Sequence, residues 1–195
     1  MKKILLHTCC APCSVSCVDS LRAEGIEPVS YWFNPNIHPY KEYQARKQTL
    51  EAYAKSIDMK LIIGGRYDVR GFLSALDGEL GGGRCAVCYR MRFEQTAKYA
   101  AENGYSSFSS TLFISPYQNH ELMLKTAEEC AKEYGVSFLH RDFRPLFREG
   151  KDSARELGLY MQKYCGCILS EADRYEKRPK KQSGEKDRAC VGKAK

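Results

Sequence analysis

The chain has 195 residues, of which 43% are hydrophobic, and a formal net charge of +7. This length suits one domain with its own core, and the hydrophobic fraction is too high for a disordered chain. No apolar stretch approaches the roughly 20 residues that span a bilayer, so we expect a cytoplasmic protein without a membrane partner.

The positive charge is concentrated near the C-terminal end. Residues 177–195 hold 8 Lys and Arg against 2 Asp and Glu, which leaves the rest of the chain nearly neutral. We therefore predict a single α/β domain over residues 1–175 and a basic, disordered tail over residues 176–195. A nucleic-acid surface on the folded part must come from local clusters of charge, with the tail as an aid.

The alternation of apolar runs and turn residues predicts strands that alternate with helices. The glycine-rich stretch 77–84 is expected to be a loop. From the N-terminus, the predicted elements are a strand at 3–7, a helix at 11–24, a strand at 28–33, a helix at 39–57, a strand at 60–63, a helix that follows Cys88 and ends near 102, a strand at 106–112, a helix at 119–134, a strand at 136–140 and a helix at 153–161.

This order of elements favours a Rossmann-like parallel sheet of about five strands flanked by helices. Strands joined by helical segments form βαβ units, which require a parallel sheet with helices on both faces. Such sheets bind ligands beyond the carboxyl ends of their strands. Cys9 and Cys10 directly follow the first predicted strand, so we expect a site there.

The ten cysteines carry the strongest chemical signal. In a reducing compartment, closely spaced thiols usually bind metal or perform redox chemistry. Seven thiols exceed the four that one zinc ion or one iron–sulfur cluster requires, which implies a second metal, a redox disulfide or both. The seven form three close groups: Cys9, Cys10 and Cys13; Cys85 and Cys88; and Cys165 and Cys167.

The positions of three of these thiols suggest reactivity. Cys13 falls in the first turn of a helix, where the helix dipole is expected to lower its pKa. Cys165 and Cys167 are separated by one glycine, so they can bind one metal or form a small, strained and easily reduced disulfide. Structural zinc remains an alternative for the C-x-x-C pairs.

Two further side chains are candidates for acid–base or base-stacking roles. His38 follows the Asn34-Pro35-Asn36 turn, and it could donate a proton or simply form a structural hydrogen bond, as could His7. Tyr117 follows the fourth predicted strand, where it could stack against a flipped-out RNA base or pack in the core.

Six ordered motifs within residues 3–175 resemble the cobalamin-independent (QueH-type) epoxyqueuosine reductases, and no single motif would be specific. They are His7-Thr8-Cys9-Cys10-Ala11-Pro12-Cys13, Asn34-Pro35-Asn36-Ile37-His38-Pro39, Arg84-Cys85-x-x-Cys88-Tyr89, Ser110-Thr111-Leu112-x-x-Ser115-Pro116-Tyr117-Gln118, Asp142-Phe143-Arg144 and Tyr164-Cys165-Gly166-Cys167.

The resemblance implies an oxidoreductase on a HUP-like variant of the Rossmann-like sheet, with a cysteine-bearing C-terminal segment. It implies reduction of epoxyqueuosine to queuosine at the wobble base of a tRNA anticodon loop, the last step of queuosine biosynthesis. Electrons would come from an unidentified donor. The implied cofactor is a [4Fe-4S] cluster on Cys9, Cys10, Cys85 and Cys88.

The resemblance also implies a redox-active role for Cys165 and Cys167, and a second metal ion near the cluster. Some members of the family carry Asp where this chain has Cys13, which makes that residue a candidate ligand of the second ion, iron or zinc. Our hypothesis is that Cys13, with Cys165 or Cys167, holds this ion against the epoxide oxygen. His38 or Tyr117 would then supply a proton.

Two rival functions compete with this interpretation. A cysteine-dependent tRNA sulfur-transferase would need a glycine-rich phosphate loop after the first strand, but residues 7–12 contain no glycine. A zinc-stabilised RNA-binding module would contain zinc and no iron.

Overall fold

The chain forms a five-stranded sheet flanked by helices in a computed structural model that describes residues 2–176. Apart from Glu176, the predicted tail at 176–195 lies outside the described residues. In chain order the elements are β1 (Lys2–His7), α1 (Ala11–Ala23), β2 (Ile26–Trp32), α2 (Tyr40–Ser56), β3 (Leu61–Ile63), α3 (Val69–Leu76), α4 (Arg84–Glu102), β4 (Ser107–Ser110), the 3-10 helix η1 (Thr111–Ile114), α5 (His120–Glu133), β5 (Ser137–Phe138), the 3-10 helix η2 (Arg144–Leu146), α6 (Phe147–Glu156) and α7 (Ile168–Tyr175).

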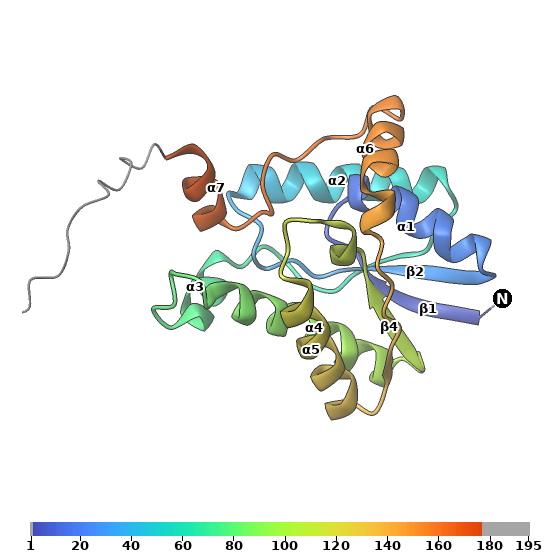
Figure 1. Ribbon diagram of the computed structural model, residues 1–195, viewed down its shortest axis with the longest axis horizontal. Helices are drawn as coiled ribbons and strands as arrows, with labels where there is room; N and C mark the ends of the chain where they lie inside the picture. The colour runs from blue at the N-terminus through green and yellow to red at the C-terminus, as the bar shows by residue number, and fades with distance from the viewer. Residues whose placement is uncertain (1, 177–195) are drawn as a thin grey trace, which may run out of the picture.

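All pairings in the sheet are parallel, and the strand order is β3-β2-β1-β4-β5. Strand β1 lies at the centre because its apolar run Ile4-Leu5-Leu6 is buried on both faces. Helices α1, α2 and α6 cover one face, and α4 and α5 cover the other (Figure 1). The predicted α/β fold with a parallel, Rossmann-like sheet is therefore confirmed.

The strand order reverses between β1 and β4, which gives the sheet its switch point. The chain leaves β1 towards one side of the sheet and later returns through β4 on the other side. At such a point the two departing loops diverge and leave a crevice at the carboxyl edge of the sheet. Helices α3 and α7 lie beyond that edge (Figure 1), so the C-terminal segment comes back to the end of β1.

Several elements differ from the sequence prediction. Helices α3 and α7 were not predicted, and α3 begins where the side chain of Asp68 accepts a hydrogen bond from the amide of Gly71 (2.9 Å). Helix α6 ends before the predicted limit because the chain turns at Gly158, whose φ is 65°. Strand β4 stops at Ser110, whose hydroxyl accepts from the amide of Leu112 and opens η1.

None of the helices formed by residues 2–176 is both long enough and apolar enough to cross a bilayer.

Candidate metal centre

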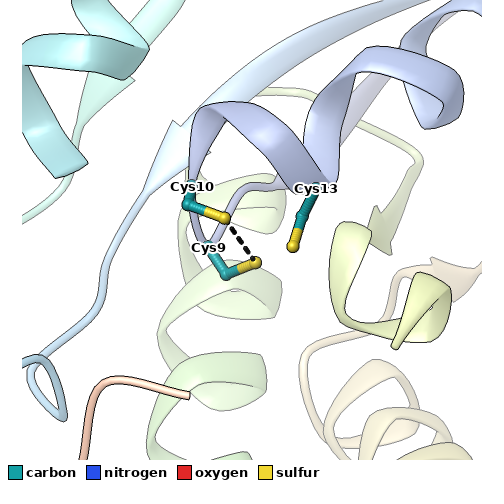
Figure 2. Close-up of side chains that lie close together, drawn as sticks. All are labelled: Cys9, Cys10 and Cys13. Carbon is teal, nitrogen blue, oxygen red and sulfur yellow. Dashed lines mark hydrogen bonds between the residues drawn. The ribbon is translucent and has the colours of Figure 1, made fainter. Parts of the chain in front are cut away.

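Three thiols meet at the carboxyl end of β1. Cys9 and Cys10 follow the strand, and Cys13 lies in the first turn of α1, so all three point into one space (Figure 2). Their sulfur atoms lie within 4.8 Å of one another, and those of Cys9 and Cys10 are 3.7 Å apart. The break in the strand that Ala11 and Pro12 provide lets adjacent cysteines face the same side, as the sequence predicted.

Two polar side chains hold this thiol triad in place. The hydroxyl of Thr111, at the end of β4, accepts a hydrogen bond from the amide of Cys9 (3.2 Å) and contacts its sulfur (3.5 Å). The amide of Gln162 donates to the sulfur of Cys10 (2.8 Å) and approaches that of Cys13 (3.5 Å). The triad is therefore contacted by side chains from two distant segments, the one that follows β4 and the one between α6 and α7.

The three thiols differ in their pKa. Hydrogen bonds from Cys10 and Cys13 hold the pKa of the Cys9 thiol well below its usual range. Burial raises the pKa of Cys10, and donation to Cys10 and Cys9 raises that of Cys13. The expectation that the helix dipole lowers the pKa of Cys13 is wrong, because three crowded thiols cannot all ionise and Cys9 ionises first.

The remaining four candidate cysteines gather in a second group beside α4. Cys88 and Cys167 share a small apolar cluster with Phe72 and Leu76. Burial raises the pKa of Cys88 to about 12, and the nearby charges of Cys165, Cys167 and Cys85 add to this effect. Cys85 and Cys165 are exposed, whereas Cys88 and Cys167 are buried, and all four are free thiols.

The buried guanidinium of Arg92 faces both groups of thiols. Its Nε donates to the carbonyl of Cys88 (3.4 Å), one helical turn earlier on α4. Burial opposes the charge of Arg92, yet the negative charges of Cys88 and Cys9 outweigh it and raise the pKa of the guanidinium. A cation with 3% exposure thus lies where it can offset the charge of thiolates from either group.

A second buried arginine anchors the cysteine hairpin, which we define as Tyr164–Cys167. The guanidinium of Arg46 on α2 donates to the carbonyls of Tyr164 (2.9 Å) and Cys165 (3.1 Å) and pairs with Glu42 (2.7 Å). These contacts bridge 118 and 119 positions of sequence and tie the hairpin to the first half of the domain.

Gly166 is required at the turn of the hairpin. Its φ of 117° is accessible to glycine, and an added Cβ would lie 2.8 Å from Cγ1 of Ile37. The amide of His38 donates to its carbonyl (2.8 Å). The tight spacing of Cys165 and Cys167 is therefore built into the backbone.

The two candidate histidines have different environments. His7 lies between the hydroxyl of Ser110 (2.9 Å) and the carbonyl of Phe33 (3.2 Å), and burial and the charge of Arg92 lower its pKa to about 3. A neutral ring with both nitrogens occupied fits a structural role. His38 is also buried, which lowers its pKa against the opposing effect of the Pro35 carbonyl.

Several buried polar atoms around the hairpin lack a hydrogen-bond partner within the described part of the chain. Such atoms are rare in protein interiors and usually meet water, an ion or a ligand. They are Oδ1 of Asn34, Oδ1 of Asn36, both ring nitrogens of His38 and Oε1 of Gln162.

Tyr117 lies apart from the buried thiols and is 84% exposed. Its ring meets that of Phe147 edge-on at a centroid distance of 5.9 Å. The core-packing alternative for this residue is therefore excluded, and the ring is free to meet a partner on the surface.

The donor set suits a thiolate-bound metal. Sulfur ligands select zinc, copper(I) and iron–sulfur centres. Ligands of one tetrahedral ion with metal–sulfur bonds of about 2.3 Å lie about 3.8 Å apart, close to the 3.7 Å between Cys9 and Cys10. Cys85 and Cys88 are not part of this compact group, among the residues described, so a centre shared with them would need sulfurs that are further apart.

The chain is thus a Rossmann-like α/β protein with a cluster of thiols at the carboxyl edge of its sheet that could hold a metal ion. Residues 4–173 match the family model described as epoxyqueuosine reductase QueH, so the chain belongs to that family. It is accordingly an oxidoreductase of queuosine biosynthesis, as the motifs predicted.

Relatives with this name cover most of the chain. The epoxyqueuosine reductase of Dehalococcoides mccartyi is 39% identical over 90% of this chain and 96% of its own length. That of Thermotoga maritima is 32% identical over 91% of this chain and 94% of its own length.

The fold is also found in a solved structure. A protein described as a predicted subunit of tRNA methyltransferase from Methanocaldococcus jannaschii matches 82% of this chain and 93% of its own chain, with a TM-score of 0.50 and 14% identity. At this identity the likeness concerns the fold alone.

Sequence reasoning missed two residues of the site. Gln162 follows a helix end without any motif, and Arg46 looks like an ordinary charged residue of a surface helix. The signal that could have revealed Arg46 is its place among buried positions on α2, between Tyr43 and Leu50.

Proposed function

We propose that this chain reduces epoxyqueuosine to queuosine at the wobble base of tRNA. The observation that carries the proposal is the convergence of the Cys9–Cys10–Cys13 thiol triad at the switch point of a chain that belongs to the epoxyqueuosine reductase family. The tRNA substrate makes the cytoplasm the expected compartment.

The proposed ligands of a [4Fe-4S] cluster are Cys9, Cys10, Cys85 and Cys88. Support comes from Arg92, which donates to the carbonyl of Cys88 and whose pKa is raised by the charges of Cys88 and Cys9. The compact triad leaves Cys13 as a ligand for a second ion, iron or zinc, with Cys165 or Cys167 from the hairpin as its partner.

The reaction removes the epoxide oxygen as water and leaves an alkene, which consumes two electrons and two protons. The bound centre would supply single electrons and a Lewis acid for the epoxide oxygen. Oxidation of Cys165 and Cys167 to a disulfide, for which the ligating thiol would leave the second ion, releases two electrons and two protons. This matches the demand of one turnover, with the bound centre passing the electrons on one at a time. An external donor must then reduce the pair again.

The chain offers two candidate proton donors. His38 is buried next to the hairpin, and neither ring nitrogen has a hydrogen-bond partner among the described residues, so either nitrogen could donate to a substrate group that reached it. Tyr117 is exposed on the loop after β4 and could donate only to a base that reaches the surface. Single His38→Gln and Tyr117→Phe variants test the two roles, and unchanged turnover in both would exclude them.

Anaerobic purification followed by iron, zinc and sulfide analysis, and then by an assay on epoxyqueuosine tRNA, tests the proposal. We expect brown protein with about four irons and four sulfides per cluster and conversion of the epoxide to the alkene. Colourless protein that contains zinc alone and converts no substrate would instead indicate the zinc-stabilised RNA-binding module.

A further inference from the structure

A second concave site lies at the carboxyl edge of the sheet, outside the thiol groups. It is a pocket of about 450 Å³ between α2, from Tyr40 to Glu51, and the turn that follows β3. This size is within the range of pockets that bind small ligands. It is lined by Tyr40, Tyr43, Gln44, Lys47, Gln48, Glu51, Gly65, Arg66 and Tyr67; we call it the tyrosine pocket.

Aromatic rings and cations line the tyrosine pocket together. Tyr40 is 52% exposed, and its ring meets that of Tyr67 edge-on at 5.3 Å, so one face of Tyr40 remains free to stack. The ring of Tyr43 is held by its hydroxyl, which donates to the carbonyl of Gly65 (3.2 Å). Tyr43 is itself buried, so the ring available for stacking is that of Tyr40, held next to Tyr67; exposed aromatic rings are what proteins use to bind unpaired bases.

The charges of the pocket favour an anion. Arg66 is exposed and makes no ion pair among the residues described, so its guanidinium is available to a phosphate. Lys47 has only a long contact with Glu51 (3.7 Å), which a stronger anion can replace. The amide nitrogen of Gln44 donates to the hydroxyl of Tyr40 (2.9 Å), and the amide of Gln48 adds a group that can both donate and accept hydrogen bonds, as a base edge requires.

A single residue, His38, connects the tyrosine pocket to the cysteine hairpin. The ring of Tyr67 contacts that of His38 (5.8 Å), and the backbone amide of His38 donates to the carbonyl of Gly166 (2.8 Å). Helix α2 also serves both places, because Tyr40 and Lys47 face the pocket while Arg46 holds the hairpin. A nucleotide in the pocket would therefore lie beside the substrate base at the hairpin.

We propose that the tyrosine pocket binds one unpaired nucleotide of the anticodon loop next to the modified base, with its base on Tyr40 and its phosphate at Arg66. This inference rests on the proposed action on tRNA. Stacking on Tyr40 would accept any of the four bases, because every base has an aromatic face. The phosphate contact would fix where along the anticodon loop the enzyme binds. The modified base is thereby positioned by its neighbour.

Binding of a synthetic RNA hairpin with the anticodon-loop sequence, followed by fluorescence anisotropy, tests the proposal on the full chain. We expect Tyr40→Ala to weaken binding at least about fivefold, because a lost base stack costs this much, and Tyr40→Phe to bind like the native chain. Arg66→Ala should weaken binding and reduce the slope of log K against log salt by about 0.7, the value for one phosphate of a single strand.

The matched control for charge is Lys3→Ala, which removes one exposed cation at the amino edge of the sheet. It should leave affinity within about twofold because the Debye length is about 10 Å at ordinary salt. Iron content and thermal unfolding are measured for every variant, so that loss of folding or of metal is separated from loss of binding.

The outcomes separate the two proposals. Suppose that the native chain converts epoxyqueuosine tRNA, and that the Tyr40→Ala and Arg66→Ala variants bind the RNA hairpin as tightly as the native chain does. The pocket proposal is then overturned, and the proposed function stands. If the native chain contains no iron and converts nothing but the two variants still lose RNA affinity, the proposed function fails and the pocket proposal stands. A native chain that neither binds nor converts overturns both.

Discussion

The side-chain amide of Gln162 donates a hydrogen bond of 2.8 Å to the sulfur of Cys10, across 152 positions of sequence. The same nitrogen lies 3.5 Å from the sulfur of Cys13. The segment between α6 and α7 thus contacts two of the three thiols of the triad. A donor in this place stabilises sulfur that carries negative charge.

Replacing Gln162 by Glu keeps the size of the side chain but puts a negative charge beside Cys10 and Cys13. We expect the pKa for the first ionisation among the three thiols to rise by about one unit, because a buried carboxylate opposes ionisation of neighbouring thiols. Ultraviolet thiolate absorbance against pH, in the metal-free protein, measures this shift. The uncharged Gln162→Met variant should shift less, and equal midpoints in the two variants would contradict the assigned role.

Truncation of Arg46 to Met should destabilise the domain strongly. It leaves Glu42 and the carbonyls of Tyr164 and Cys165 without their buried partner, which typically costs about 3–5 kcal/mol. Urea denaturation gives the free energy of unfolding. As a control, Arg155→Ala breaks an exposed ion pair and should cost less than about 1 kcal/mol; similar losses in both variants would show that Arg46 is not an anchor.

Gly166→Ala should reduce the free energy of unfolding by more than the backbone strain at this position, because the added methyl group also clashes with a neighbour. The methyl group would meet Ile37 at 2.8 Å in addition to the cost of a φ of 117°, so we expect a loss above about 2 kcal/mol and poorer iron retention. Gly158→Ala is the matched control, since its φ is also positive but no atom of residues 2–176 lies within 4 Å of an added Cβ. Its cost should stay near 1 kcal/mol, with iron content unchanged.

Removal of the charge of Arg92 should make a bound cluster harder to reduce. A buried cation that faces Cys9 and Cys88 favours added negative charge, and a loss of about 1.4 kcal/mol would lower the midpoint potential of a one-electron couple by about 60 mV. Redox titration of Arg92→Met measures this shift. Arg92→Lys keeps the charge, and it should stay close to the native potential if the effect is electrostatic.

The fold could be predicted largely from the sequence, because buried parallel strands produce continuous apolar runs. Strand β1 was recognised to within about two residues on this basis, and helix α2 equally well from its apolar stripe at helical spacing. Helix α3 was missed because Gly71 interrupts it near its start and its capping residue, Asp68, stands outside any long apolar period. Helix α7 is short and polar, with no fully buried residue, so it has almost no periodic signal.

The site could be predicted only in part, for a different reason. The cysteines are marked by their spacing, which limits the chemistry they can perform. Residues such as Gln162 and Arg46 act through contacts between distant segments, and no local pattern reports such contacts. The order of ionisation in the triad also escaped prediction, because it depends on which thiol receives the hydrogen bonds of its neighbours.

The distance along the chain between the thiol triad and the hairpin has a consequence for assembly. During synthesis, Cys9, Cys10 and Cys13 leave the ribosome long before Gln162, which bonds to the sulfur of Cys10, and the hairpin that follows it. The triad therefore stays open to incoming metal until the end of the domain has been made. A folded protein from which the metal has been removed should rebind it slowly, at a rate set by the local opening of the C-terminal segment.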